Sequence, residues 1–303
     1  MAMIPRAYPH PVRGVLWMLL TGLNFVAVTA IVKHVGGGVP APQAAFLRYL
    51  MGLIFFVPMF GPMMRAGLSR RHLALFSARG AAHALGVIFW FYAMTQIPIA
   101  EVTAMNYLNP VYVTIGAALF LGETLHRPRI IAIGVALVGV VIILRPGFRE
   151  ISPGHLAMLL TAMFFGISYL LAGLLSGEVR PSVVVALLSI SVTIGLAPFA
   201  AAVWVTPTLA QLGWLFLVAV FATAGHYTMT RAFAAAPMTV TQPVTFVQLV
   251  WATLLGWLLF AEALDVWVIL GGGLILGSVT FITWREAMRR RRTVTPPPEA
   301  TKF

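Results

Sequence analysis

The sequence has 303 residues, of which 60% are hydrophobic and only 9% are charged, and its mean hydropathy is +0.94. This composition excludes a water-soluble fold, because soluble domains carry about a quarter charged residues, and it indicates an integral membrane protein. The absence of cysteine excludes disulfides, thiolate nucleophiles and cysteine-based metal sites. The net charge of +12 does not indicate nucleic-acid binding, because most Lys and Arg residues lie in short connections between apolar segments.

A helix needs about 20 apolar residues to cross a bilayer, and about ten such windows can be drawn. The first, from Gly14 to Val32, is too long for the apolar core of a signal peptide, and further windows follow it, so we expect an uncleaved helix. The predicted spans are residues 14–34, 43–62, 73–96, 99–121, 128–145, 154–175, 182–203, 210–233, 239–260 and 266–284.

The sequence is internally duplicated. Ala93 to Arg145 aligns without a gap with Ala232 to Trp284 at a shift of 139 positions, and residues 14–25 match residues 154–165 at a shift of 140. Each copy contains five predicted spans, and because five is odd the second copy enters the membrane from the opposite side. The sequence therefore predicts an all-α integral membrane protein with ten transmembrane helices in two inverted five-helix repeats.

Positive charge predicts the orientation, because cytoplasmic loops are rich in Lys and Arg. If the N-terminus is cytoplasmic, the outer loops hold only Lys33, Arg145 and Arg149, and all other loop and tail cations lie inside. We expect a multi-pass protein of the cell inner membrane with both termini in the cytoplasm. Its predicted parts are a first repeat at residues 1–150, a second repeat at residues 151–286 and a basic, disordered cytoplasmic tail at residues 287–303.

Inverted repeats are typical of secondary transporters, whose substrate site lies near the membrane midplane between the repeats. The duplication therefore favours a carrier of a small-molecule substrate, with the lipid bilayer as its surroundings. A duplicated bundle that transports nothing is the alternative.

Several motifs resemble the EamA branch of the drug/metabolite transporter superfamily. They are the paired prolines Pro98 and Pro237, the run NYLNP from Asn106 to Pro110, and Leu121-Gly122-Glu123 at the end of the fourth span, which Phe260-Ala261-Glu262 matches. The resemblance implies a ten-helix carrier, but the family includes exporters of amino acids and drugs as well as importers of nucleotide-like metabolites and vitamins. Its aromatic amino-acid exporters tend to have Trp where Asn109 stands, so we do not expect that substrate.

Polar side chains inside the spans are costly in hydrocarbon, so we expect them to face the bundle interior or a wet cavity. Pro110 leaves the carbonyl of Asn106 without its helical partner, which predicts a kink that turns Asn106 and Asn109 toward one cavity; Pro243 predicts a weaker kink in the ninth span. A kink that only improves packing is the alternative. The predicted substrate-binding residues of this kind are Asn24, His83, Trp90, Asn106, Tyr107, Asn109, Tyr169, His226, Tyr227, Gln242 and Gln248.

Arg48 completes the predicted site. It lies about five residues inside the second span, where an arginine costs about 2.5–3.5 kcal/mol if it is central. Two interpretations stay open: the side chain faces the pathway and attracts an anionic substrate group, or it snorkels to the lipid head groups.

Three further expectations concern coupling, stacking and assembly. Protons are a candidate coupling ion through His83 or His226, but the spans have no clear midplane Asp or Glu, so facilitated diffusion or exchange stays open. Trp90, Tyr107 and Tyr169 are expected to stack on a ring-bearing substrate. The GxxxG run from Gly273 to Gly277, with Gly134 and Gly139 in the other repeat, predicts close helix packing in a monomer or a homodimer.

The sequence contains no HExxH, P-loop or GxSxG motif and no His/Asp/Glu cluster with metal-ligand spacing, so we predict no enzyme, metal or cofactor. The main hypothesis is a secondary transporter that moves a small organic metabolite or drug by alternating access, in an unassigned direction. Three alternatives stay open: an uptake carrier for a ring-containing nutrient such as a flavin or nucleotide-like metabolite, a non-transporting scaffold, and an intramembrane enzyme.

Overall fold

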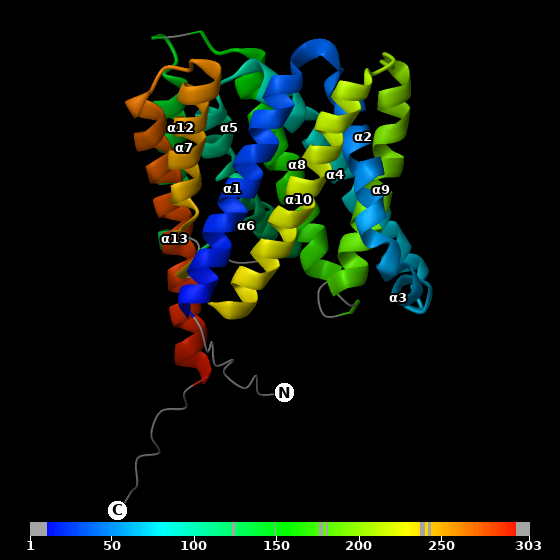
Figure 1. Ribbon diagram of the computed structural model, residues 1–303. Helices are drawn as coiled ribbons and strands as arrows, with labels where there is room; N and C mark the ends of the chain where they lie inside the picture. The colour runs from blue at the N-terminus through cyan, green and yellow to red at the C-terminus, as the bar shows by residue number, and fades with distance from the viewer. Residues whose placement is uncertain are drawn as a thin grey trace, which may run out of the picture.

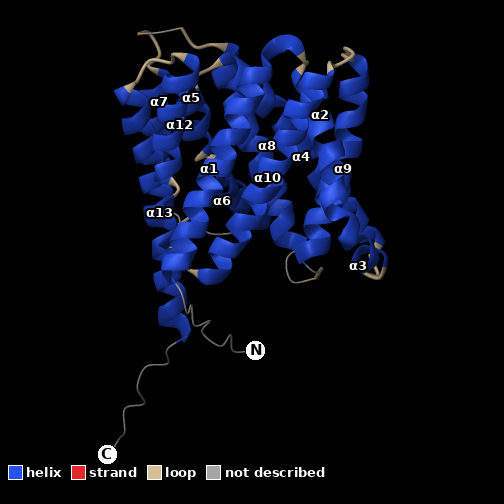
Figure 2. Ribbon diagram, viewed as in Figure 1, coloured by secondary structure: helices blue, strands red, loops and turns tan. Residues whose placement is uncertain are grey.

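The computed structural model describes residues 11–122, 125–148, 150–175, 178–179, 181–236, 240–241 and 244–294. Figure 2 shows that these parts are almost entirely helical, and no strand occurs in them. The prediction of an all-α membrane fold is confirmed.

The helices of the first half are α1 (Pro11–Val35), α2 (Ala41–Gly52), α3 (Phe60–Met64), α4 (Arg70–Gln96), α5 (Ile99–Asn106), α6 (Asn109–Leu121) and α7 (Arg127–Leu144), with the 3₁₀ segments η1 (Gly36–Gly38) and η2 (Leu53–Met59). Those of the second half are α8 (Pro153–Leu175), α9 (Pro181–Ala202), α10 (Leu209–Ala235), α12 (Phe246–Phe260) and α13 (Val266–Val294).

Eight helical segments of the described chain are long and apolar enough to cross a membrane. The predicted fourth span, residues 99–121, is divided into α5 and α6, because Pro110 cannot donate the hydrogen bond that would continue the helix. In the predicted ninth span, residues 239–260, the longest described helix is α12, with 15 residues. The structure thus shows a multi-pass helical protein with eight such segments among its described residues, rather than ten uninterrupted spans.

The last helix is longer than the sequence analysis expected. We predicted a disordered tail from residue 287, whereas α13 continues to Val294. Arg, Ala and Met are strong helix formers, so the basic run prolongs the helix beyond the apolar segment. Residues 295–303 lie outside the described part of the chain.

The duplication is visible in the helix ends. Ser69 caps α4 by accepting a 3.2 Å hydrogen bond from the His72 N–H, and Thr208 caps α10 in the same way with Gln211 at 3.2 Å. The two caps are 139 positions apart, as are Gly122 and Ala261, which end α6 and α12 in the left-handed conformation. The repeats therefore share local geometry as well as sequence.

The packing of the helices is also repeated. α1 packs along α10, and α8, the counterpart of α1, packs along α4, the counterpart of α10. The equivalent helices α7 and α13 pack on each other, as do α2 and α9. Figure 1 shows that α1 begins and α13 ends at the same end of the bundle, which we call the proximal end; the opposite end, with η1, is the distal end.

Small residues allow α7 and α13 to approach closely, at the predicted Gly139 and at Gly271, which was not predicted. A Cβ atom added to Gly139 would lie 2.6 Å from the Gly271 carbonyl oxygen, and one added to Gly271 would lie 2.5 Å from the Gly139 carbonyl oxygen. Gly134 and Gly277 face open space instead. The predicted close packing is therefore confirmed at Gly139, whereas Gly134 and Gly277 take no part in it within this chain.

Candidate functional site

A hydrogen-bonded chain joins α2, α4 and α8 in the middle of the bundle. His83 of α4 lies 3.1 Å through Nε2 from the Tyr49 hydroxyl of α2 and 3.1 Å through Nδ1 from the Ser168 hydroxyl of α8. All three side chains are buried. Both ring nitrogens of His83 are therefore occupied, which fixes the orientation of the ring.

Aromatic rings of α4 and α8 surround this chain. Phe165 stacks on His83 with ring centroids 4.7 Å apart and an interplanar angle of 28°. Trp90 meets the edge of Phe165 at 6.2 Å, and Tyr169 lies 6.3 Å from it. The Trp90 Nε1 atom is buried without a hydrogen-bond partner. A flat ligand ring would find both stacking surfaces and a donor here.

Two arginines lie beside the same chain. Arg48 is 7% exposed, and its guanidinium carbon lies 4.0 Å from the centroid of the Tyr49 ring. Arg79, one helical turn before His83 on α4, is 6% exposed, and its Nε and Nη1 atoms are buried without a partner. Arg48 and Arg79 both lie within electrostatic range of His83. We call Arg48, Tyr49, Arg79, His83, Phe165 and Ser168 the central cluster.

The α1–α10 side of the bundle carries three of the predicted residues. Asn24 is buried and donates a 2.7 Å hydrogen bond to the Leu20 carbonyl oxygen of its own helix. His226 meets the edge of Phe25 at 5.3 Å and lies within electrostatic range of Arg48, so it belongs beside the central cluster. Tyr227 is 57% exposed and accepts a hydrogen bond from Arg231, which lies one turn nearer the proximal end. This orientation separates the Tyr227 side chain from the central cluster.

The break between α5 and α6 forms a second polar centre. Asn109 Nδ2 donates to Asn106 Oδ1 at 3.0 Å, whereas Asn109 Oδ1 is buried without a partner. The Tyr107 hydroxyl donates a 2.7 Å hydrogen bond to the Thr245 carbonyl oxygen at the start of α12. Pro110 occupies the second position of α6, so the break lies where the sequence placed the kink.

The predicted residues of the ninth span are only partly described. Gln248 on α12 is half-buried against α1, where its Cβ atom lies opposite Gly22. Gln242 and Pro243 lie outside the described residues. The structure thus brings together Arg48, His83, Trp90, Tyr169 and His226, and it places Asn24, Tyr227 and Gln248 elsewhere.

Ion pairs hold the distal end together. Lys33, near the end of α1, pairs with Glu262 and donates a 2.9 Å hydrogen bond to the Ile97 carbonyl oxygen after α4. Glu262 also accepts the N–H of Ile99 at 2.9 Å, which satisfies the free amino end of α5. Arg145 pairs with Asp265 between α7 and α13. We call Lys33 and Glu262 the distal latch.

A buried pair lies beside this latch. Glu101 of α5 is 2% exposed, and its Oε2 atom lies 2.6 Å from Nε2 of His155 on α8, which is 4% exposed. Neither residue was among the predicted site residues. Their positions, three residues into α5 and α8, were visible in the sequence, but the pairing across 54 residues was not.

The sequence and the fold were compared with known proteins. The model of the EamA-like transporter family matches residues 12–145 and 152–284. This chain belongs to the EamA-like transporter family. The riboflavin transporter of Rhizobium johnstonii is 32% identical over 288 residues, covering 92% of this chain and 93% of the relative. The pseudopaline exporter CntI of Pseudomonas aeruginosa is 28% identical over 267 residues, covering 87% of this chain and 93% of the relative.

A solved crystal structure supports the fold of this EamA-like transporter. It superposes with a TM-score of 0.54 at 20% sequence identity and covers 90% of this chain and 96% of the other. The fold is therefore shared with a solved structure, and the match of the family model to both repeats confirms the resemblance to the family.

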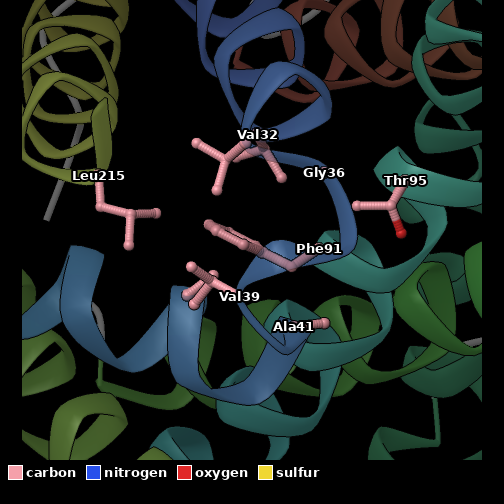
Figure 3. A pocket seen from close by; sticks show the side chains of 9 residues that line it. Val32, Gly36, Val39, Ala41, Phe91, Thr95 and Leu215 are labelled. Carbon is pink, nitrogen blue, oxygen red and sulfur yellow. The ribbon is translucent and has the colours of Figure 1, made fainter. Parts of the chain in front are cut away.

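A small pocket of this EamA-like transporter lies at the distal end between α1, η1, α2, α4 and α10. Figure 3 shows the apolar side chains of Val32, Val39, Phe91 and Leu215 pointing toward one another around it. Its volume of about 10 Å³ is close to the minimum that one water molecule requires. The distal ends of these helices are therefore tightly packed, and this pocket is no metabolite site.

In the parts of the chain that the structure describes, no three His, Asp and Glu side chains are grouped closely enough to hold a metal ion. The central cluster consists instead of guanidinium, imidazole, hydroxyl and aromatic groups, which are the kinds of group that line organic-ligand sites in proteins.

Arg79 is the functional candidate that the sequence analysis overlooked. It lies inside the predicted third span, residues 73–96, and four residues before His83, so it shares a helical face with that histidine. The filter that singled out Arg48, a cation inside an apolar window, also applies to Arg79. In the structure it is as deeply buried as Arg48.

Proposed function

We propose that this EamA-like transporter moves a small organic metabolite across the cell inner membrane by alternating access between two inverted five-helix repeats. The repeats comprise residues 1–150 and 151–286. The observation that carries the proposal is the placement of unpartnered buried polar atoms on helices of both repeats, namely Arg79, Trp90, Asn109 and Trp251. In a bilayer such atoms are costly, and a bound solute would satisfy them.

The inverted arrangement is supported by the ends of α1 and α8. Lys33 near the end of α1 contacts Ile97, and Glu101, four residues later, contacts His155 at the start of α8. Equivalent helices therefore cross the bundle in opposite directions. Ten spans follow if the α5–α6 pair and the segment that ends with α12 are each counted as one broken span.

The orientation in the membrane follows from charge. We place the proximal end in the cytoplasm, with both termini, because Arg65, Arg70 and Arg71 lie there whereas the cations Lys33 and Arg145 at the distal end are paired with acids. In this orientation the distal latch closes the outer end. Opening to the outside requires the latch to separate.

Uptake of a ring-containing nutrient is the second candidate function. It is favoured by the 32% sequence identity to a riboflavin transporter and by the rings of Trp90, Phe165 and Tyr169 around His83. The similarity to a pseudopaline exporter supports export equally, so direction has to be measured.

The test is solute transport by the purified full-length protein in liposomes. Riboflavin, S-adenosylmethionine, amino acids and metal-chelating carboxylates are supplied on either side, with and without a pH gradient. Saturable movement of one class supports the proposal, and dependence on the gradient shows proton coupling. Movement of none of these solutes contradicts the proposal.

Alternating access has its own test, because the chain contains no cysteine and a single introduced one reports its own accessibility. The two positions are Val39→Cys in the packed distal pocket and Tyr227→Cys on the exposed surface of the proximal half of α10. A transported solute should change the labelling rates of the two positions in opposite directions. Changes in the same direction would contradict the proposal.

Asn109→Ala tests the helix break. Because Asn109 Oδ1 has no partner in the protein, the substitution should lower the affinity for the transported solute by about tenfold. Its expression and thermal midpoint should change little. A large loss of stability with unchanged affinity would show a packing role instead.

A further inference from the structure

The centre of the bundle holds two positive charges that no described acidic side chain neutralises. Arg48 and Arg79 are each less than one-tenth exposed. Neither makes a hydrogen bond or ion pair with any described residue, and two nitrogens of Arg79 are fully buried without a partner. By contrast, the half-buried Lys33 and Arg145 at the distal end each contact a carboxylate.

The two arginines belong to one site. Tyr49, next to Arg48, is hydrogen-bonded to His83, and Arg79 lies one turn before His83 on the same face of α4. Tyr49 and Tyr169 both lie within electrostatic range of Arg79. Tyr169 also contacts Phe165, whose ring stacks on His83, so the aromatic rings and the two guanidinium groups lie around the same histidine.

The described acidic residues form no ion pair with these arginines. The acidic side chains that the structure describes are Glu101, Glu150, Glu178, Glu262 and Asp265, all at helix starts or in connections at the two ends of the bundle. A buried charge persists in a membrane protein when a partner or a function compensates for its desolvation.

We infer that Arg48 and Arg79 together bind the negatively charged group of the transported solute. The solute is an organic anion, a carboxylate or a phosphate ester, whose planar part lies on the rings of Phe165 and Tyr169. Arginine suits this role because its planar fork donates two parallel hydrogen bonds to either group. This inference rests on the proposed function and specifies its substrate class.

Matched pairs of solutes test the charge requirement. We would measure the thermal midpoint of the purified full-length protein with riboflavin 5′-phosphate against riboflavin, nicotinate against nicotinamide, and citrate against its triethyl ester. At least one anionic member should bind about tenfold or more tightly than its neutral partner, the range expected for charge-assisted hydrogen bonds.

Substitutions locate the effect. Arg79→Gln and Arg48→Gln should abolish the preference for the anion, and Arg79→Lys, which keeps the charge, should retain part of it. Arg70→Gln removes the same charge from the exposed first residue of the same helix and should leave the preference intact. If Arg79→Gln does not fold, Arg48→Gln and Arg79→Lys still decide the question.

The outcomes separate this inference from the proposed function. Equal affinity within every pair, no binding of any anion, or a preference that survives both glutamine substitutions would overturn the two-arginine site. If the protein binds anions with the expected mutant pattern but moves no solute across liposomes, the site stands and the transport proposal fails. If it transports only neutral solutes, transport stands and the site fails.

Discussion

The same local device occurs at both ends of the antiparallel pair α4 and α8. At the proximal end, His72 accepts the Ser69 N–H through Nδ1 and approaches Glu178, after α8, at 2.9 Å through Nε2. At the distal end, His155 accepts the Ser152 N–H through Nδ1 and approaches Glu101, after α4, at 2.6 Å. In each case the accepting Nδ1 leaves the proton on Nε2 to bind the carboxylate.

The two ends differ in burial. The side chains of His155 and Glu101 are 5% and 3% exposed, whereas those of His72 and Glu178 are 17% and 44% exposed. Water competes for the proximal pair and not for the distal pair, so equal hydrogen bonds hold the distal end more firmly. The contact between α4 and α8 is therefore held more firmly at its distal end than at its proximal end.

Removing the distal carboxylate should have the largest effect. Glu101→Leu leaves the Nε2–H of His155 buried without this acceptor, and we expect the free energy of unfolding to fall by about 3 kcal/mol. Chemical unfolding in detergent measures it. The double variant Glu101→Leu/His155→Phe should recover much of the loss, because it replaces the pair by apolar groups; a larger loss in the double variant would contradict this account.

Weakening the distal latch should cause the second-largest loss of stability. Glu262→Gln keeps an oxygen for the Ile99 N–H but removes the charge that Lys33 binds. Because both side chains are partly exposed, we expect a loss of about 1–2 kcal/mol. A double-mutant cycle with Lys33→Gln isolates the pair, and a coupling energy near zero would show that the latch contributes nothing.

A substitution in the central cluster, between the two ends, should raise the free energy of unfolding instead of lowering it. Arg79→Met removes an unpaired buried charge and fills the same space with an apolar chain, so the free energy of unfolding should rise by about 1 kcal/mol. The measurement is the same unfolding experiment without solute. A loss of stability would mean that Arg79 has a structural partner and would weaken the comparison.

The proximal pair should give the smallest effect. Hydrogen bonds from His72 and Arg71 lower the pKa of the Glu178 carboxyl from its ordinary value of 4.5. A lowered pKa contributes stability that is present above that value and is lost as the pH falls through the lower folded-state pKa. The thermal midpoint should therefore drop slightly more below pH 4.5 in the wild type than in Glu178→Gln. Identical pH profiles would contradict the assignment.

Much of the fold was predictable from the sequence because it depends on local patterns. Apolar length placed the helices, the shift of 139 residues revealed the repeat, and Pro110 located the break in the fourth span. The long α13 was missed because a basic run after an apolar segment is compatible with both a helix and a tail.

The site was less predictable because it depends on pairing between distant residues. Polarity inside a span correctly singled out Arg48 and His83 as buried, but nothing local distinguishes Asn24, which bonds its own helix, from Asn109, which has an unpartnered oxygen. Arg79 satisfied the same rule as Arg48. The role proposed for Arg79 depends on the lack of a described hydrogen-bond partner for its buried nitrogens, which only the packed structure shows.

The hydrogen bond from Tyr107 to the Thr245 carbonyl oxygen has a mechanical consequence. It ties the break between α5 and α6 in the first repeat to the residue that precedes α12 in the second repeat, 138 positions later. While this bond is kept, bending at the break displaces the start of α12. In the proposed transport cycle, the two repeats would therefore move together at this point.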